Sequence, residues 1–164
     1  MLEIKNLTKK YGEKVAVDDL SLTVQTGQIC AFIGHNGAGK TTTLKAIAGI
    51  LNFEQGEIKI DGIDVKKNPM EAKRILAYLP DNPDLYEYLT GIEYLNFIAN
   101  IFKMSESDRK QKIEEYAKRI GIFDALQNPI SSYSHGMKQK LALVSALIHS
   151  PRLLLLDEPF VGLD

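Results

Sequence analysis

The stretch Gly34-His-Asn-Gly-Ala-Gly-Lys-Thr41 decides the fold of this 164-residue chain. It fits the pattern of a phosphate-binding loop, which is Gly, four residues, Gly, Lys and then Ser or Thr. Glycines leave the backbone bare, so that consecutive N–H groups can surround an anion, and the following helix adds the positive end of its dipole. We expect phosphate contacts from the loop and the first helical turn: Gly34, Asn36, Gly37, Ala38, Gly39, Lys40, Thr41 and Thr42.

The residues on either side of the loop support this interpretation. The apolar run 28–33 precedes it and predicts a strand, and residues 40–50 follow it with a helical pattern. Cys30 lies within the apolar run and is expected to be a small buried hydrophobic residue. Lys40 is placed to reach the outer phosphates, and the Thr41 hydroxyl to bind Mg²⁺. A ligand-free turn between strand and helix is the plainer alternative.

Composition indicates an ordinary soluble globular protein of one domain. The chain is 45% hydrophobic and 25% charged, and its formal net charge is −1. No nucleic-acid partner is expected, because a global basic field is absent. A single cysteine excludes an intrachain disulfide. With no signal-peptide core at the start and no apolar stretch near the roughly 18 residues of a spanning helix, we expect a cytoplasmic chain whose membrane role comes through a partner.

The first third predicts strands. Residues 2–7 and 20–24 alternate apolar with polar side chains, as half-buried strands do. Residues 57–60 and 63–65 flank Asp61-Gly62 and predict a hairpin, since Asp-Gly suits a turn with positive φ. With the loop and its helix, these strands indicate an α/β core over residues 1–83.

The middle of the chain, residues 84–131, predicts a mostly helical insertion. A strand over residues 75–79 and a turn-rich segment over 80–84 precede it. Thr90 stands three residues before Glu93, the capping-box pattern that begins a helix. Two helices follow, whose buried faces are expected to hold Ile92, Leu95, Ala99 and Phe102, and then Ile113, Tyr116, Ala117 and Ile120.

Residues 132–164 return to the α/β core. A helix is expected over 136–149, where Pro151 bars its continuation, and Leu153–Leu156 predicts a fully buried parallel strand. That strand ends on Asp157 and Glu158. An acid pair at a strand end is common as a solvated terminus, but beside a phosphate loop it favours an aspartate in the Mg²⁺ shell and a glutamate that polarises water toward the γ-phosphate.

Several segments together resemble the ATP-binding cassette (ABC) family. Tyr133-Ser-His-Gly-Met-Lys-Gln-Lys140 is similar to the family's signature segment, Ser-Gly-Gly-Gln at the start of a helix, and Tyr11 looks like the aromatic residue that stacks on adenine. Residues 78–86 resemble the Q-loop and residues 160–164 the D-loop. The resemblance implies an α/β P-loop NTPase with an N-terminal antiparallel β subdomain, a parallel core sheet and a helical subdomain.

The resemblance also implies a mechanism and partners. Two such domains face each other around two ATP molecules with Mg²⁺, and Ser134 with the N–H groups near Gly136 contacts the γ-phosphate held by the other domain. Hydrolysis then drives an integral membrane permease. Residues 80–91 are similar to those of bacterial exporter-type cassettes. Tyr86, Tyr88, Tyr94 and Phe97 are expected either to line the groove for a permease helix or to form subdomain core.

The chain departs from the family pattern in three places. His135 and Met137 replace a glycine and a glutamine of the signature, and Asp81 takes the place of the Q-loop glutamine near Mg²⁺. The sequence ends at Asp164, before the family's switch histidine and C-terminal core strands, and none of the histidines present matches that switch. We therefore expect a form truncated after the D-loop, with weak nucleotide binding and poor turnover.

Two further functions stay open beside the transporter ATPase. One is a non-catalytic nucleotide-binding regulatory module, and the other is a soluble ABC ATPase of translation or DNA repair. A kinase or GTPase is disfavoured, because the signature segment has no place in either and no Asn-Lys-x-Asp guanine reader occurs. Neither the transported substrate nor the choice between homodimer and heterodimer can be read from these residues.

Overall fold

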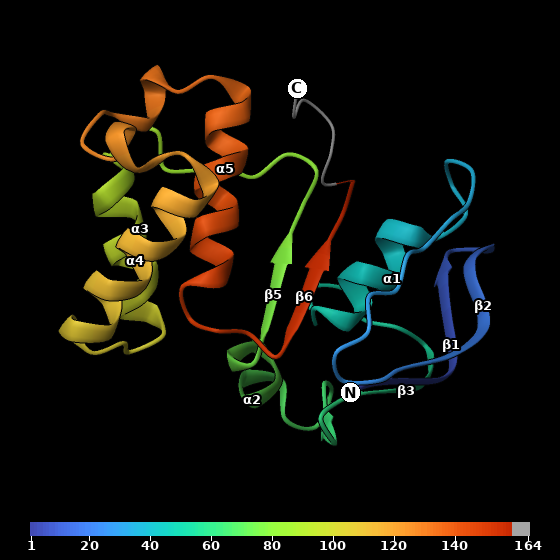
Figure 1. The fold of residues 1–164 in the computed structure, drawn as a ribbon. Helices are drawn as coiled ribbons and strands as arrows, with labels where there is room; N and C mark the ends of the chain where they lie inside the picture. The colour runs from blue at the N-terminus through green and yellow to red at the C-terminus, as the bar shows by residue number, and fades with distance from the viewer. Residues whose placement is uncertain (159–164) are drawn as a thin grey trace. The chain divides into compact units, whose positions relative to one another are not determined.

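The computed structural model describes residues 1–158, which fall into two compact units, Met1–Tyr78 and the described part of Leu79–Asp164. Figure 1 shows the elements of each unit. The segment 160–164, predicted to be a D-loop, lies outside the described residues. The predicted division of the chain at residues 83 and 131 stays a prediction.

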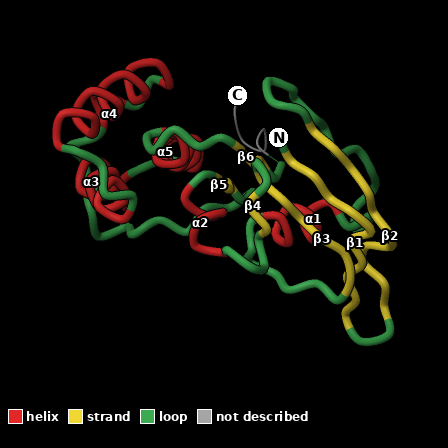
Figure 2. The backbone as a smooth tube through the Cα atoms, turned by 90° about the horizontal axis from the view of Figure 1, so that it is seen from below, coloured by secondary structure: helices red, strands yellow, loops and turns green. Residues whose placement is uncertain are grey.

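The first unit is built on a four-stranded sheet with the order β2-β1-β3-β4. Its strands are β1 (Leu2–Tyr11), β2 (Lys14–Val24), β3 (Gln55–Ile60) and β4 (Ile63–Asp64). All pairs are antiparallel, and Leu2 lies opposite Val24 on one side and Ile60 on the other. Figure 2 shows these strands side by side. The predicted N-terminal antiparallel subdomain is confirmed.

The hairpin between β3 and β4 turns at the predicted dipeptide. Asp61 and Gly62 have φ values of 48° and 81°, both in the left-handed region. This pair of positive φ values matches the twist of the flanking strands, which is why Asp-Gly favours such turns. The N–H of Asp61 also donates to the carbonyl of Met1, 2.8 Å away. The turn thereby joins the start of the chain to the sheet.

Two helices accompany the sheet, α1 (Lys40–Ile47) and α2 (Pro69–Arg74). The buried side of α1 carries Thr43, Leu44, Ala46 and Ile47. It is shorter than the helix predicted over 40–50. Gly49, with φ of 64°, follows its end, in agreement with the preference for glycine just after a helix.

The predicted strand over residues 28–33 is absent, and this prediction was wrong. Ile29 and Ile33 are almost fully exposed, at 101% and 95%, and Cys30 is exposed rather than buried. An apolar run forms a strand only where a neighbouring strand supplies backbone partners and a second layer covers its side chains. Within residues 1–158, no strand pairs with this run.

The second unit is mainly helical. Its elements are α3 (Gly91–Ile101), α4 (Glu106–Ile120), the short 3₁₀ helices η1 (Phe123–Ala125) and η2 (Ile130–Ser132), α5 (His135–Leu147) and β6 (Leu153–Leu156). It also contains Leu79, the last residue of β5 (Leu76–Leu79). The helices pack around one apolar core, whose fully buried members are Leu95, Ala99, Ala117, Ile130, Leu141, Val144 and Ile148.

In the second unit, α3 and α4 begin directly after residues whose side chains cap them. The Thr90 hydroxyl accepts a hydrogen bond from the N–H of Glu93, and the Glu93 carboxylate accepts one from the N–H of Thr90 at 2.8 Å, which confirms the predicted capping box. The Ser105 hydroxyl caps α4 by accepting a hydrogen bond from the N–H of Asp108, and Gly121 ends the helix with φ of 74°. These local interactions fix where α3 and α4 begin and end.

The strand β6 forms as predicted, but it is only partly buried. Leu155 is 5% exposed, whereas Leu154 and Leu156 are exposed at 36% and 37%. Side chains two residues apart lie on one face of a strand. The face that carries Leu154 and Leu156 is thus only partly covered within residues 1–158, so the prediction of full burial was wrong. Among residues 1–158, no helix is long and apolar enough to cross a membrane.

Candidate phosphate-binding site

The predicted phosphate loop keeps two glycines in a conformation that other residues rarely adopt. Gly37 and Gly39 have φ values of 84° and 87°. Gly39 also approaches β2 closely, because a β-carbon at this position would lie 2.4 Å from the carbonyl oxygen of Ala16. Only glycine satisfies both demands. The close approach to Ala16 was not visible in the sequence.

Lys40 reaches back over the loop from the first turn of α1. Its Nζ donates to the carbonyl oxygens of Gly34 at 2.7 Å and His35 at 3.1 Å. The N–H of Ala38 closes the loop on the same His35 carbonyl, 3.1 Å away. The ammonium group therefore stands over the bend that the loop makes. Within residues 1–158, the hydrogen bonds that hold it there go to neutral carbonyls, which an anion can replace as partners.

The N-terminus of α1 is open to an anion. Its N-cap residue is Gly39, no side chain caps the first turn, and no acidic residue lies there. The first amides of a helix have no partner inside the helix, and the helix dipole favours negative charge near them. Thr41 and Thr42 belong to this turn. The predicted phosphate contacts 34–42 thus lie in one continuous segment of the first unit, and their role stays a prediction.

Tyr11 also belongs to the first unit, at the end of β1. Its ring is 51% exposed, and the Nζ of Lys9 lies 5.2 Å from the ring centroid. An exposed ring of this kind offers one face for stacking on a base. Tyr11 ends its strand with an exposed ring, and its stacking on adenine stays a prediction.

The predicted signature residues lie at the N-terminus of α5 in the second unit. Ser134 is the N-cap residue, and its hydroxyl accepts a hydrogen bond from the N–H of Met137 at 3.3 Å. Gly136 lies in the first turn, which has no acidic residue. Ser134 and His135 are exposed. This helix start therefore presents a hydroxyl and backbone amides at the surface of its unit.

The predicted acidic residues are also in the second unit. Asp157 is 4% exposed, and its N–H donates to the carbonyl of Leu79 at 2.9 Å. Glu158 is exposed and has φ of 49°, a left-handed conformation that is uncommon outside glycine. No residue pattern indicated this backbone strain, which occurs often at functional sites. Asp81 is exposed, and its carboxylate accepts from the N–H of Asn82 at 2.8 Å.

The predicted site residues thus form two groups. Loop residues 34–42 and Tyr11 lie in the first unit, and the acids with the signature residues lie in the second. Within residues 1–158, no three carboxylate, imidazole or thiol groups gather as a metal site. Protein Mg²⁺ sites of nucleotide enzymes commonly use only one or two carboxylates together with phosphate oxygens, so the carboxylate and hydroxyl donors present here fit that ion.

Comparison with known proteins gives the same family on several independent lines. The family model described as ABC transporter matches residues 17–161. The uncharacterized ABC transporter ATP-binding protein YhcH of Bacillus subtilis (strain 168) is 37% identical over 100% of this chain and 53% of its own length. The ABC transporter ATP-binding protein NatA of the same organism is 37% identical over 100% of this chain and 69% of its own length.

A solved ATP-binding subunit of an ABC transporter superimposes with a TM-score of 0.93 at 36% identity, covering 99% of this chain and 68% of that one. The chain spans about half the length of most of the curated relatives it matches. The predicted resemblance is confirmed: the chain belongs to the family of ABC transporter ATP-binding domains, and it has their α/β P-loop fold.

Proposed function

We propose that the chain binds and hydrolyses ATP as the nucleotide-binding part of a bacterial ABC transporter. One observation carries the proposal. The bare, left-handed glycines of the loop, the uncapped start of α1 and the ammonium of Lys40 lie together in one short segment, where they would suit an anion. Membership of the family adds that this anion is the phosphate chain of ATP.

Each residue of the first unit then has a role in binding. Amides of residues 34–42 donate to the phosphate oxygens, and Lys40 exchanges the carbonyls of Gly34 and His35 for the outer phosphates. The charged partner makes a stronger hydrogen bond than the carbonyl that it replaces. Tyr11 stacks on the adenine ring.

The acids of the second unit supply the chemistry. Thr41, Asp157 and Asp81 would hold Mg²⁺, which when bound would neutralise charge on the phosphate oxygens. Glu158 takes a proton from a water molecule as the water oxygen bonds to the γ-phosphorus. The bond from that phosphorus to its bridging oxygen breaks, and ADP and phosphate result. The exposed carboxylate of Glu158 is accessible to that water.

A second cassette domain completes the site. Ser134 and the amides near Gly136 would contact the γ-phosphate bound by the other copy, because a helix N-terminus favours negative charge. A solved relative supports this arrangement: the ATP-binding cassette MJ0796 was determined as a dimer in a post-hydrolysis state with ADP and Pi, with a TM-score of 0.87 and 27% identity.

The partner that uses this cycle is a membrane permease, and export is the favoured direction. The rings of Tyr86, Tyr88 and Phe97 are exposed at 45%, 82% and 41%, and Tyr86 lies 5.9 Å from Tyr88 and 5.5 Å from Phe97 between centroids. Tyr94, the fourth aromatic of this group, is buried and belongs to the core. The exposed aromatics therefore favour a docking surface, and the chain would lie on the cytoplasmic face of the membrane through it.

Relatives indicate the kind of transport. Among them are a bacitracin transport ATP-binding protein of Bacillus licheniformis and the lipopolysaccharide export ATP-binding protein of Haemophilus influenzae, which are 37% and 36% identical to this chain. The first name describes transport and the second export. These relatives favour export as the direction of transport for this chain.

The test separates binding from hydrolysis. Glu158→Gln keeps the shape of the side chain but cannot accept a proton, so ATP binding should remain while phosphate release falls by a factor of about 100 or more. Binding without release in the unchanged protein would instead identify the non-catalytic regulatory module. Slow turnover by residues 1–164 alone stays a prediction, measured by comparing their ATPase rate with that of a full-length relative.

A further inference from the structure

A buried lysine lies beside the ring of Tyr11 in the first unit. Lys9 is 8% exposed, and its Nζ lies over the Tyr11 ring, 5.2 Å from the centroid. Lysine is almost never fully buried in proteins unless it is paired. The function proposed above gives Lys9 no role, although this residue lies in β1 only two positions before the ring that would stack on adenine.

Glu54 is the partner of this lysine. Its Oε1 accepts a hydrogen bond from the Nζ of Lys9 at 2.8 Å, and its Oε2 accepts one from the N–H of Lys10 at 2.8 Å. The bond from Lys9, and after it the bond from Lys10, lowers the pKa of the Glu54 carboxyl. The N–H of Glu54 also donates to the carbonyl of Thr8 at 3.2 Å. The carboxylate therefore holds both the ammonium group and the adjoining backbone of β1.

The strand β1 is irregular at this place. Lys9 lies opposite Val17 of β2, but Lys10 lies opposite Val15, so the register shifts between the two lysines. A β-bulge changes the direction in which nearby side chains point, and bulges occur often next to active sites. Glu54 bonds to the residues on both sides of this shift. Its carboxylate thus fixes the irregular part of the strand that leads directly to Tyr11.

A cation over one face of the Tyr11 ring restricts the positions that the ring can take. An exposed aromatic side chain would otherwise populate several rotamers. An ammonium group within about 6 Å of the centroid attracts the negative face of the ring. Because the ring is 51% exposed, the opposite face is the one available to a base.

We propose that Lys9, held by Glu54, is a positioning residue that orients Tyr11 for stacking on the base of a nucleotide. This inference rests on the function proposed above, because it requires a nucleotide whose base reaches Tyr11. Lys9 acts through the ring. A side chain that is already held in place loses less conformational freedom on binding, so its contact contributes more to affinity. The pair of Lys9 and Glu54 thereby strengthens the contribution of the base relative to that of the phosphates.

The experiment compares ADP with pyrophosphate, which lacks the base and the ribose, by isothermal titration of the whole chain with Mg²⁺ present. ADP should bind to the unchanged protein at least about tenfold more tightly than pyrophosphate, because stacking adds to the phosphate contacts. Lys9→Met should weaken ADP binding about threefold to tenfold and leave pyrophosphate binding unchanged. Lys9→Arg should keep most of the ADP affinity, since a guanidinium also pairs with a carboxylate and lies over aromatic rings.

A double variant separates positioning from a general effect on the fold. Tyr11→Ala removes the ring, so adding Lys9→Met to it should cause no further loss of ADP affinity. Thermal unfolding shows whether Lys9→Met folds. If it does not, Glu54→Gln removes the charge that holds the ammonium group, and it should give the same selective loss of ADP affinity.

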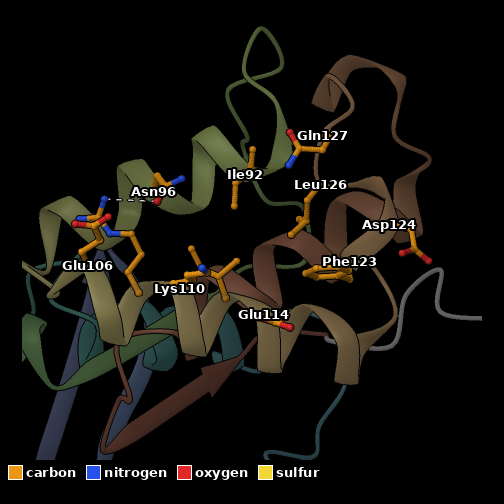
Figure 3. A pocket seen from close by; sticks show the side chains of 11 residues that line it. Ile92, Asn96, Glu106, Lys110, Glu114, Phe123, Asp124, Leu126 and Gln127 are labelled. Atoms are coloured by element: carbon orange, nitrogen blue, oxygen red, sulfur yellow. Dashed lines mark hydrogen bonds between the residues drawn. The ribbon is translucent and has the colours of Figure 1, made fainter.

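Two other lysines provide controls. Lys10 is exposed and bonds to Glu54 through its N–H, which Lys10→Met keeps. Lys110 lies in the second unit, where it lines a cavity of about 760 Å³ between α3 and α4 (Figure 3), so Lys110→Met removes the same charge from a different unit. Neither variant should change the ratio of the ADP and pyrophosphate affinities.

The outcomes distinguish this inference from the function on which it rests. Equal losses of ADP and pyrophosphate affinity in Lys9→Met, or no loss of either, would overturn the positioning role while phosphate binding by the loop stands. Pyrophosphate binding as tight as ADP binding in the unchanged protein would also overturn it, because the base would then contribute nothing. Binding of neither probe to the unchanged protein would overturn both.

Discussion

A β-carbon on Gly91 would lie 2.3 Å from the hydroxyl oxygen of Tyr133. That hydroxyl donates a hydrogen bond of 2.6 Å to the carbonyl of Ala125, so it cannot turn aside without losing a partner. The first amides of α3 meet the same segment, because the N–H of Ile92 donates to the carbonyl of Leu126 at 2.8 Å. Tyr133 immediately precedes the N-cap of α5. The start of α3 therefore packs closely against the segment that leads into α5.

Gly91→Ala should therefore destabilise the protein by about 1–3 kcal/mol, the usual cost of overpacking a buried contact. Tyr133→Phe alone should cost about 0.5–1.5 kcal/mol through its lost hydrogen bond. The double variant should be more stable than the sum predicts, because the clashing oxygen is gone. Urea unfolding of the four proteins measures this coupling, and simple additivity would show that the contact between the two residues is not what requires glycine.

Gly39 and Gly37 offer a matched pair within the phosphate loop. Both have φ above 80°, but only Gly39 would bring a β-carbon against a backbone oxygen, whereas Gly37 has nothing within 4 Å. We expect Gly37→Ala to cost about 1 kcal/mol from its left-handed backbone alone. Gly39→Ala should cost at least about twice as much, since the Ala16 carbonyl must move. Thermal unfolding compares them, and equal losses would contradict the close approach to β2.

Lys40→Met should weaken nucleotide binding about 100-fold without lowering the thermal unfolding midpoint, because the lysine contacts only exposed carbonyls of its own loop. Lys45→Met is the control, a cation in the last turn of the same helix. Titration with a fluorescent ATP analogue measures both. Retained affinity in Lys40→Met would remove the basis of the proposed function.

The capping box of α3 predicts a pH dependence of stability. Hydrogen bonds from the N–H and then the hydroxyl of Thr90 lower the pKa of the Glu93 carboxyl below its ordinary value. A carboxyl whose pKa is lowered by folding stabilises the protein above its unfolded pKa and loses that contribution as the pH falls through the folded pKa. Wild type should thus be more stable than Glu93→Gln at pH 7, and the difference should shrink below about pH 4. Urea titrations at both pH values check this; a difference that grows on acidification would contradict the assigned direction.

Tyr88→Ser tests the proposed permease surface. The ring is 82% exposed, so its removal should change the free energy of unfolding by no more than about 0.5 kcal/mol. Co-purification with the permease subunit should nevertheless fall severalfold, because exposed aromatics commonly anchor interfaces. Met70→Ser serves as the control, because Met70 is an exposed apolar side chain that lies in the first unit, whereas Tyr88 lies in the second. Similar retention of the permease by both variants would place the docking surface elsewhere.

The sequence by itself determined the features that depend on neighbouring residues in the chain. The Asp61-Gly62 turn and the Thr90 capping box formed where predicted, and Gly37 and Gly39 of the loop take the positive φ values that glycine allows. Each of them is decided by the conformations and hydrogen bonds available within a few residues. Family membership was also readable, because it rests on short motifs of this local kind.

Tertiary structure alone decided which apolar residues are covered. The run 28–33 has the composition of a buried strand and yet leaves Ile29, Cys30 and Ile33 exposed, while Tyr94 is buried and Tyr88 of the same aromatic group is not. The close approach of Gly91 to Tyr133 likewise joins the start of α3 to the segment that precedes α5. Burial depends on what another part of the chain brings against a residue, and that is a property of packing that local sequence does not contain.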